Sequence, residues 1–112
     1  MNGIKLVDSL SPAISRGQIF RLPARWPYEE IVDFMVLDIP DEQYGHSIAV
    51  ASGNKSGLLV VCLPVDSCLP QTHGLSREWL VKNWAKWVYP DCPVENVYLF
   101  DRAEVPSDLT ER

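Results

Sequence analysis

Proline placement is the feature that most restricts how this chain can fold. Nine prolines divide the 112 residues into short segments. Because proline lacks a backbone N–H and clashes with the preceding turn of a helix, frequent prolines mark strand ends and loops and leave little room for long helices. The pattern therefore predicts short strands joined by loops, with one helix that ends before Pro90.

Most segments between the prolines have the character of strands. Branched and aromatic residues dominate residues 29–39, and apolar side chains occupy both alternating faces there, which predicts a strand in the centre of a sheet. A helix over residues 28–37 is the alternative, but Pro40 and the β-branched content disfavour it. Similar short runs predict further strands at 4–8, 17–22, 46–51, 58–63 and 94–100. The glycine-containing segment 52–57 is typical of a hairpin loop.

One amphipathic helix is predicted from Ser76 to about Tyr89. Ser76 is a favourable N-cap, and Glu78 places a carboxylate in the first turn, where the helix dipole stabilises it. An apolar stripe at helical spacing must pack on the sheet: Leu80, Trp84, Trp87 and Val88. The element order βββββαβ predicts an α+β fold. We expect a mostly antiparallel, curved sheet of five or six strands with the helix packed on one face.

Composition fits one domain that spans residues 1–112, with a frayed tail over 101–112. Apolar residues make up 46% of the chain and charged residues 22%, which is typical of a folded chain. No apolar run approaches the ~20 residues of a membrane span, and the first residues lack the pattern of a signal peptide. The cysteines have no framework spacing, so we expect reduced thiols in the cytoplasm: Cys62, Cys68 and Cys92.

The net charge of −5 is unevenly distributed along the chain. Residues 26–54 contain no Lys or Arg but carry six carboxylates: Glu29, Glu30, Asp33, Asp38, Asp41 and Glu42. A segment with only negative charge repels phosphate backbones and attracts basic proteins. A solvated surface that keeps a small protein soluble is the more common reason for such a run, and that interpretation stays open.

No catalytic or metal-binding motif is present. The chain lacks a nucleophile elbow, a phosphate-binding glycine loop and a dinucleotide fingerprint. Cys68, His73 and Cys92 do not have the spacing of a zinc site, and Cys68 with His73 in one loop is a weak nucleophile–base pair. Glu29 and Asp33 share a strand face, as a pair for acid–base chemistry would, but solvated surface is the more common case. We therefore expect no catalytic residue, cofactor or metal ion.

Two aromatic groups allow a binding role. The first lies on the predicted helix: Trp79, Trp84 and Trp87. Core packing is the more common role of such a group, although aromatic residues interleaved with bases also stack on nucleic-acid bases. The second lies in a proline-rich corner: Arg25, Trp26 and Tyr28. This corner is either a structural latch, with Arg25 stacked on a ring, or an exposed anchor for a partner.

Two long strings in the chain resemble a known family. They are RGQIFRLPARWPYEEIVDFM at 16–35 and WLVKNWAKWVYPDC at 79–92, the latter followed by Val97 and Tyr98. Both resemble the corresponding halves of a bacterial immunity-protein family, the one catalogued as immunity protein forty-five. Such proteins are encoded beside secreted or contact-delivered toxins of polymorphic toxin systems and protect the producing cell by binding the toxin. The resemblance implies a toxin inhibitor that is not an enzyme, and it names neither a toxin nor a cofactor.

The charge pattern is compatible with that role. Many such toxins are basic nucleases, and an acidic surface can occupy a phosphate-binding cleft. We therefore predict a basic toxin domain as the partner, and neither nucleic acid nor a membrane. The predicted contact residues are the six carboxylates of residues 26–54, with Arg25, Trp26 and Tyr28 as second candidates. A ligand- or nucleic-acid-binding module that uses the tryptophan helix, or a small enzyme that uses the acidic strand face, remains the alternative.

Overall fold

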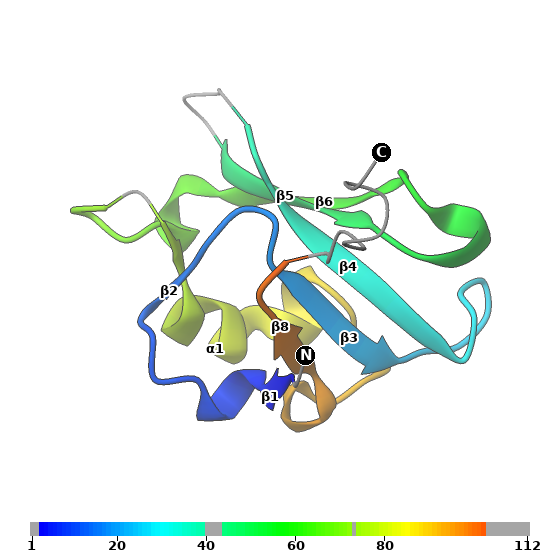
Figure 1. The fold of residues 1–112 in the computed structure, drawn as a ribbon. Helices are drawn as coiled ribbons and strands as arrows, with labels where there is room; N and C mark the ends of the chain where they lie inside the picture. Colours follow the sequence, from blue (N-terminus) through cyan, green and yellow to red (C-terminus); the bar gives the residue numbers. More distant parts are fainter. Residues whose placement is uncertain (1–2, 40–43, 73, 103–112) are drawn as a thin grey trace, which may run out of the picture.

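A computed structural model describes residues 3–39, 44–72 and 74–102. Its main layer is an antiparallel six-stranded sheet in the order β1-β8-β3-β4-β5-β6 (Figure 1). The strands of this sheet are β1 (Ile4–Lys5), β3 (Ile19–Pro23), β4 (Ile31–Asp38), β5 (Tyr44–Val50), β6 (Leu59–Pro64) and β8 (Tyr98–Phe100). A small second sheet and one helix complete the fold: β2 (Ala13–Ile14), β7 (Leu75–Ser76) and α1 (Arg77–Trp87). The predicted α+β class is confirmed, and the predicted frayed tail lies beyond the described residues from position 103 onward.

Strand β4 occupies the centre of the sheet, between β3 and β5, as its sequence predicts. Its side chains at Val32, Phe34 and Val36 are fully buried on the face that α1 covers. They continue into the neighbouring strands, where Phe20 lies opposite Phe34 and Ile48 lies opposite Val36. This cross-strand alignment gives the sheet one continuous apolar face.

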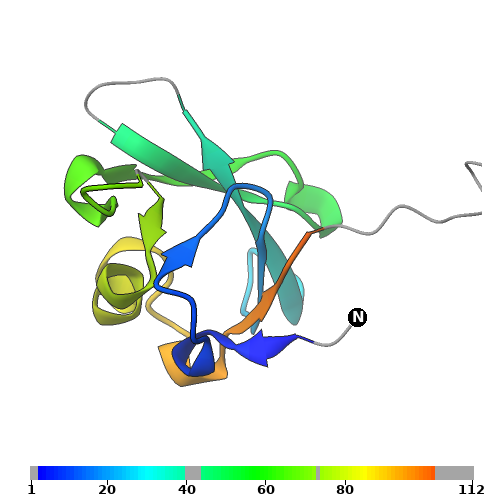
Figure 2. The same ribbon diagram turned by 60° about the vertical axis from the view of Figure 1, so that its left-hand side comes forward.

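Helix α1 starts where the sequence predicts. The Ser76 hydroxyl accepts a hydrogen bond from the backbone N–H of Trp79 at 3.1 Å, which satisfies one of the free donors of the first turn. The helix ends at Trp87 and not at Tyr89. The N–H groups of Val88 and Tyr89 both donate to the carbonyl of Trp84, at 2.8 and 3.1 Å, so the last turn closes early. Figure 2 shows α1 on one side of the sheet.

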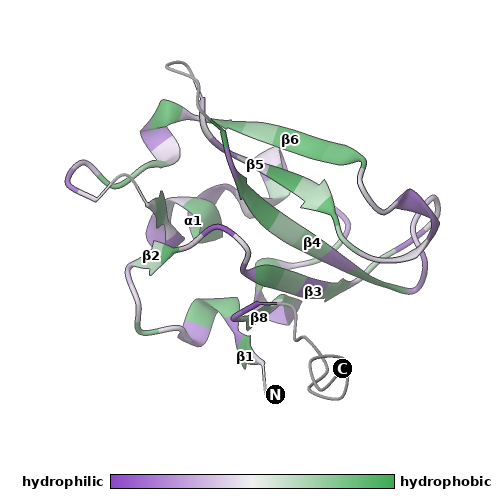
Figure 3. Ribbon diagram, turned by 45° about the horizontal axis from the view of Figure 1, so that its top comes forward, coloured by the Kyte–Doolittle hydropathy of each residue, from purple (hydrophilic) through white to green (hydrophobic). Residues whose placement is uncertain are grey.

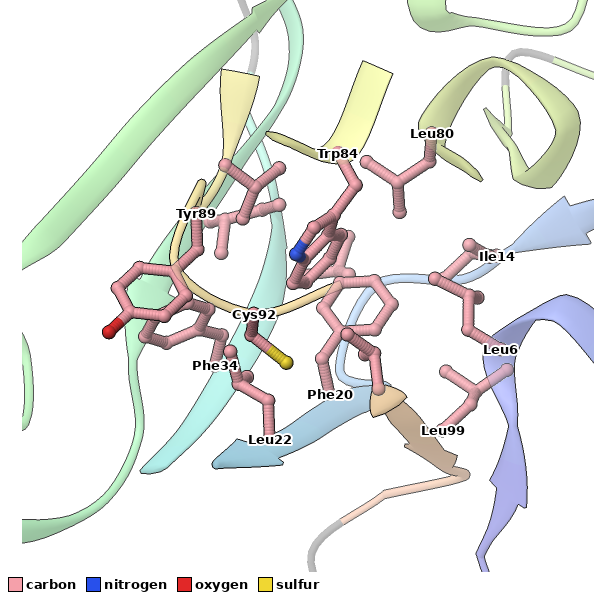
Figure 4. Close-up of a cluster of buried hydrophobic side chains, with 14 of the residues drawn as sticks. Leu6, Ile14, Phe20, Leu22, Phe34, Leu80, Trp84, Tyr89, Cys92 and Leu99 are labelled. Carbon is pink, nitrogen blue, oxygen red and sulfur yellow. The ribbon is translucent and has the colours of Figure 1, made fainter. Parts of the chain in front are cut away.

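Trp84 lies at the centre of the contact between the helix and the sheet. Its ring meets Phe20 edge to face, with 5.4 Å between ring centroids and 79° between the planes (Figure 4). Its indole N–H has no hydrogen-bond partner among the described residues, so shape and apolar contact hold it in place. Leu80 and Val88 are buried beside it as predicted, whereas Trp87 is half-buried and packs against Trp79.

Several short elements were not predicted. Strands β2 and β7 lie outside every predicted strand, and they pair with each other over only two residues. The predicted strand at 4–8 is extended only at Ile4–Lys5, because a 3-10 helix follows directly. Leu6, the first residue of that helix, is completely buried, and its backbone N–H donates a hydrogen bond to the carbonyl of Val97. The last predicted strand starts late for a similar reason, since residues 94–96 form a 3-10 helix.

The opposite face of the sheet is not covered by a helix in the described part of the chain. Ile31 and Leu59 on this face are 62% and 58% exposed, and Met35 and Leu37 are half-buried. Figure 3 shows hydrophobic residues along β5 and β6 and polar residues in the loops at the strand ends. No helix in the described residues is long and apolar enough to cross a membrane. The sheet is therefore covered by α1 on one side and partly open on the other.

We expect Trp84→Ala to lower the free energy of unfolding by about 3–5 kcal/mol, because it removes a large, fully packed ring and leaves a cavity. Urea denaturation followed by circular dichroism measures this change. Lys86→Ala, at an exposed position of the same helix, is the matched control and should change stability by less than about 0.5 kcal/mol. Equal stability of Trp84→Ala and wild type would contradict this description of the core.

Candidate functional site

The acidic residues predicted to contact a partner are distributed along β4. Glu29 and Glu30 precede the strand, Asp33 lies within it and Asp38 ends it. Because a strand rises about 3.3 Å per residue, Ile31 and Asp38 are roughly 23 Å apart. Asp41 and Glu42 lie outside the described residues. The described carboxylates therefore divide between the two ends of β4 and do not form one cluster.

Asp33 forms an ion pair within the sheet. It lies directly opposite Arg21 on β3, and its carboxylate accepts two hydrogen bonds from the guanidinium, at 2.8 and 3.0 Å. These bonds raise the pKa of Arg21. The guanidinium of Arg21 also makes a cation–π contact with Phe100, at 4.6 Å from the centre of the ring. The charge of Asp33 is thus compensated by its cross-strand neighbour.

Glu29 joins two loops at one end of the sheet. Its carboxylate accepts a hydrogen bond from the backbone N–H of Asn54 at 3.2 Å. Residue 53 must be glycine here, because its φ of +73° is left-handed and a Cβ would collide with the Glu29 carboxylate. The carboxylates of Glu29 and Asp33 thus each bind a partner within the fold, Asn54 for Glu29 and Arg21 for Asp33.

Glu30 and Asp38 are exposed, but their surroundings differ. Asp38 borders an open depression whose lining also includes Arg16 and Arg102. Glu30 lies at the other end of β4, where its backbone carbonyl accepts a hydrogen bond from Ala24 at 2.8 Å. Glu30 is therefore an exposed carboxylate beside the corner that contains Trp26.

That corner, residues 24–30, connects β3 to β4 and is fixed to the core. The hydroxyl of Tyr89 accepts a hydrogen bond from the backbone N–H of Arg25 at 2.9 Å, and Figure 4 shows this hydroxyl pointing out of the buried cluster. The Tyr28 ring packs edge to face against Phe34 and Tyr89, with centroid distances of 5.6 and 5.9 Å. The Tyr28 N–H also donates to the Arg25 carbonyl at 2.9 Å.

The three aromatic and basic residues of the corner have different environments. Tyr28 is half-buried, whereas the side chain of Arg25 is exposed and only its backbone N–H is held. The cation–π contact found in the described residues involves Arg21 and not Arg25. Trp26, which precedes a cis proline, is 91% exposed. The contacts that fix the corner to the core are thus made by the Tyr28 ring and the backbone N–H of Arg25. Trp26 projects into solvent.

The sequence did not predict the cysteine–histidine contact that the structure contains. The pair considered from the sequence was Cys68 with His73. His73 lies outside the described residues, and the structure places Cys68 Sγ 3.8 Å from Nδ1 of His46. These two residues are far apart in the sequence, so no local spacing could indicate the contact. Burial raises the pKa of the Cys68 thiol, which keeps it in the protonated form that is a poor nucleophile.

Cys68 has a packing role. Its sulfur occupies the space over Gly45, where an added Cβ would collide with it. The three cysteines are free, and no group of three or more potential metal ligands occurs among the described residues. The contact between Cys68 and His46 is therefore best described as part of the packing between β5 and the loop after β6.

We expect Cys68 to make the protein less stable at alkaline pH. A thiol whose pKa is raised by folding favours the folded state fully below its unfolded pKa, about 8.5. That contribution is lost as the pH rises through the folded pKa. Urea midpoints at pH 7, 8, 9 and 10 should decline less steeply for Cys68→Ala than for wild type. Parallel declines would show that this thiol does not contribute.

Comparison with known proteins gives one match. The family model described as immunity protein 45 matches residues 6–99. No curated protein and no solved structure matches the chain. The matched range starts at the buried Leu6 and includes α1, the strands from β2 to β7 and the corner at 24–30. The resemblance of the two sequence strings is thereby confirmed, and the chain belongs to the immunity protein 45 family.

Proposed function

We propose that this chain is a cytoplasmic immunity protein that binds and neutralises one cognate bacterial toxin. The observation that carries the proposal is the family match over residues 6–99. The toxin is a domain of a polymorphic, contact-delivered system, and the complex is noncovalent. The immunity protein acts as an inhibitor and catalyses no reaction, because blocking a surface of the toxin is sufficient for protection.

A rigid surface is the physical requirement for such inhibition. A preformed interface loses little conformational entropy on binding, so more of its contact energy appears as affinity. The corner at 24–30 meets this requirement, because Tyr28 and the backbone of Arg25 attach it to the core. The same corner carries exposed side chains that have no role in the fold.

Charge supports a basic partner. The net charge is −5, and a negative field speeds encounter with a basic protein while it repels phosphate. Within the acidic segment, Glu30 and Asp38 are exposed, whereas Asp33 is paired with Arg21. We therefore propose Glu30 and Asp38, with Asp41 and Glu42 of the same segment, as the residues that steer a basic toxin, such as a nuclease.

The alternative functions find less support in the side-chain arrangement. Trp84 is buried, and Trp79 and Trp87 pack against each other with 5.9 Å between ring centroids. The helix thus offers no row of free rings for stacking on bases. An enzyme that uses the acidic strand face would need free carboxylates that converge, but Glu29 and Asp33 bind Asn54 and Arg21.

Co-production with the toxin domain encoded by the adjacent gene tests the proposal. The chain should restore growth to cells that make the toxin domain, and the two purified proteins should form a complex on gel filtration. Failure of wild type both to protect and to bind this toxin domain would contradict the proposed function.

We expect the double variant Glu30→Lys/Asp38→Lys to bind the toxin domain about tenfold more slowly at low salt, because it reverses the local field that steers association. Surface plasmon resonance at two salt concentrations measures the association rate. The control Asp8→Lys/Asp101→Lys makes the same change in net charge at exposed positions outside the acidic segment. Equal slowing by both double variants would remove Glu30 and Asp38 from a special role.

A further inference from the structure

We propose that Trp26 anchors the toxin interface: its indole enters an apolar pocket on the toxin, and basic residues at the border of that pocket contact Glu30. This inference rests on the proposed function. It adds the residue that carries most of the affinity and the chemistry of the toxin surface that receives it.

The exposure of Trp26 sets it apart from the other tryptophans. Its side chain is 91% exposed, whereas Trp84 is 1% exposed and Trp79 and Trp87 are half-buried. An indole has a large apolar surface, so removing it from water would be stabilising. The exposed Trp26 side chain does not gain this stabilisation in the free protein. Tryptophan is also among the residues most enriched at the energetic centres of protein interfaces. An exposed indole on a well-ordered turn therefore indicates a contact made with a partner.

Several hydrogen bonds and ring contacts hold the turn that carries Trp26. Its base is closed by the hydrogen bond from Ala24 to Glu30, and its flank is attached to Tyr89 through Arg25. The next residues are fixed as well, because Tyr28 packs in the aromatic cluster and Glu29 binds the neighbouring loop. Figure 1 shows both loops at the same end of the sheet. Little backbone freedom remains to be lost when Trp26 binds.

Three exposed neighbours define the chemistry of the surface around the indole, and the first is Arg25, which directly precedes Trp26. Ile31, which lies opposite Pro23 at the base of the turn, is 62% exposed and adds apolar area. Glu30 precedes it and adds an exposed carboxylate. We call Arg25, Trp26, Glu30 and Ile31 the Trp26 patch. A complementary partner surface has an apolar pocket for the indole and a Lys or Arg beside it for Glu30.

Charge distinguishes a protein from other occupants of the Trp26 patch. Arg25 precedes Trp26 and Glu29 and Glu30 follow it, so the corner carries net negative charge, which repels the phosphates of nucleic acids and of anionic membranes. A symmetric pair of this chain would place the same patch on both sides of the interface. Two surfaces that both carry net negative charge would then oppose each other, which like-charge repulsion disfavours. A basic toxin meets neither obstacle.

The test compares Trp26→Ala with wild type for binding to the toxin domain encoded by the adjacent gene. The dissociation constant should rise about 30-fold or more, as expected for the loss of an interface anchor. The melting temperature should stay within about 1 °C of wild type, since exposed positions contribute little to stability. Leu10→Ala is the matched control, because Leu10 is 98% exposed and lies outside the Trp26 patch; its affinity should equal that of wild type.

A spectroscopic readout follows Trp26 itself. The chain is labelled with 5-fluorotryptophan while the toxin domain stays unlabelled, and Trp26→Phe assigns the fluorine resonance. In the free protein this resonance should shift between H2O and D2O, because the ring is exposed. In the complex the solvent shift should disappear, since the pocket excludes water. A solvent shift that persists in the complex would place Trp26 outside the interface.

The outcomes separate this inference from the proposed function. If wild type binds the toxin domain and Trp26→Ala binds equally well, the anchor is wrong and the immunity role remains. If wild type neither binds nor protects, the proposed function itself is contradicted. If the free chain forms a dimer that Trp26→Ala abolishes, the occupant of the Trp26 patch is a second copy, and the toxin-anchor inference is overturned.

Discussion

The edge-to-face contact between Trp84 and Phe20 is the interaction on which the rest of the structure depends. It joins the one α-helix of the described chain to β3, one of the two central strands of the sheet. Because this contact fixes the helix on the sheet, the segment after the helix lies against the turn of the β3–β4 hairpin. There Tyr89 meets Arg25 and Tyr28. The order of the exposed corner is thus a consequence of core packing.

The acidic segment shows how a fold redistributes charge that appears uniform along the sequence. Strand pairing places Arg21 opposite Asp33 and compensates it, and loop packing assigns Glu29 to the backbone of Asn54. A carboxylate that binds a cross-strand or loop partner contributes less to the negative electrostatic potential outside the protein. The exposed negative charge that remains at the corner is centred on Glu30, beside Trp26 and Ile31. Charge and exposed apolar area therefore meet at one place.

Much of the fold could be predicted because its signals are local. The apolar faces of β4, the N-cap Ser76 and the helical spacing of Leu80 and Trp84 each lie within one segment. The two-residue pairing of β2 with β7 could not be predicted, since it depends on the meeting of distant segments. The same holds for the candidate site. Tyr28 and Trp26 look alike in the sequence, and only the tertiary contacts with Phe34 and Tyr89 separate the buried ring from the exposed one.

The exposure of Trp26 has an evolutionary consequence. A side chain that is 91% exposed contributes almost nothing to the folding equilibrium, so selection for stability does not restrict its identity. The latch beneath it, formed by Tyr28 and Tyr89, is restricted because it belongs to the core. Under the proposed function, a toxin and its inhibitor that diverge together can therefore exchange residues at position 26 without passing through a poorly folded inhibitor. Lineages of such pairs can drift apart in specificity while the scaffold stays the same.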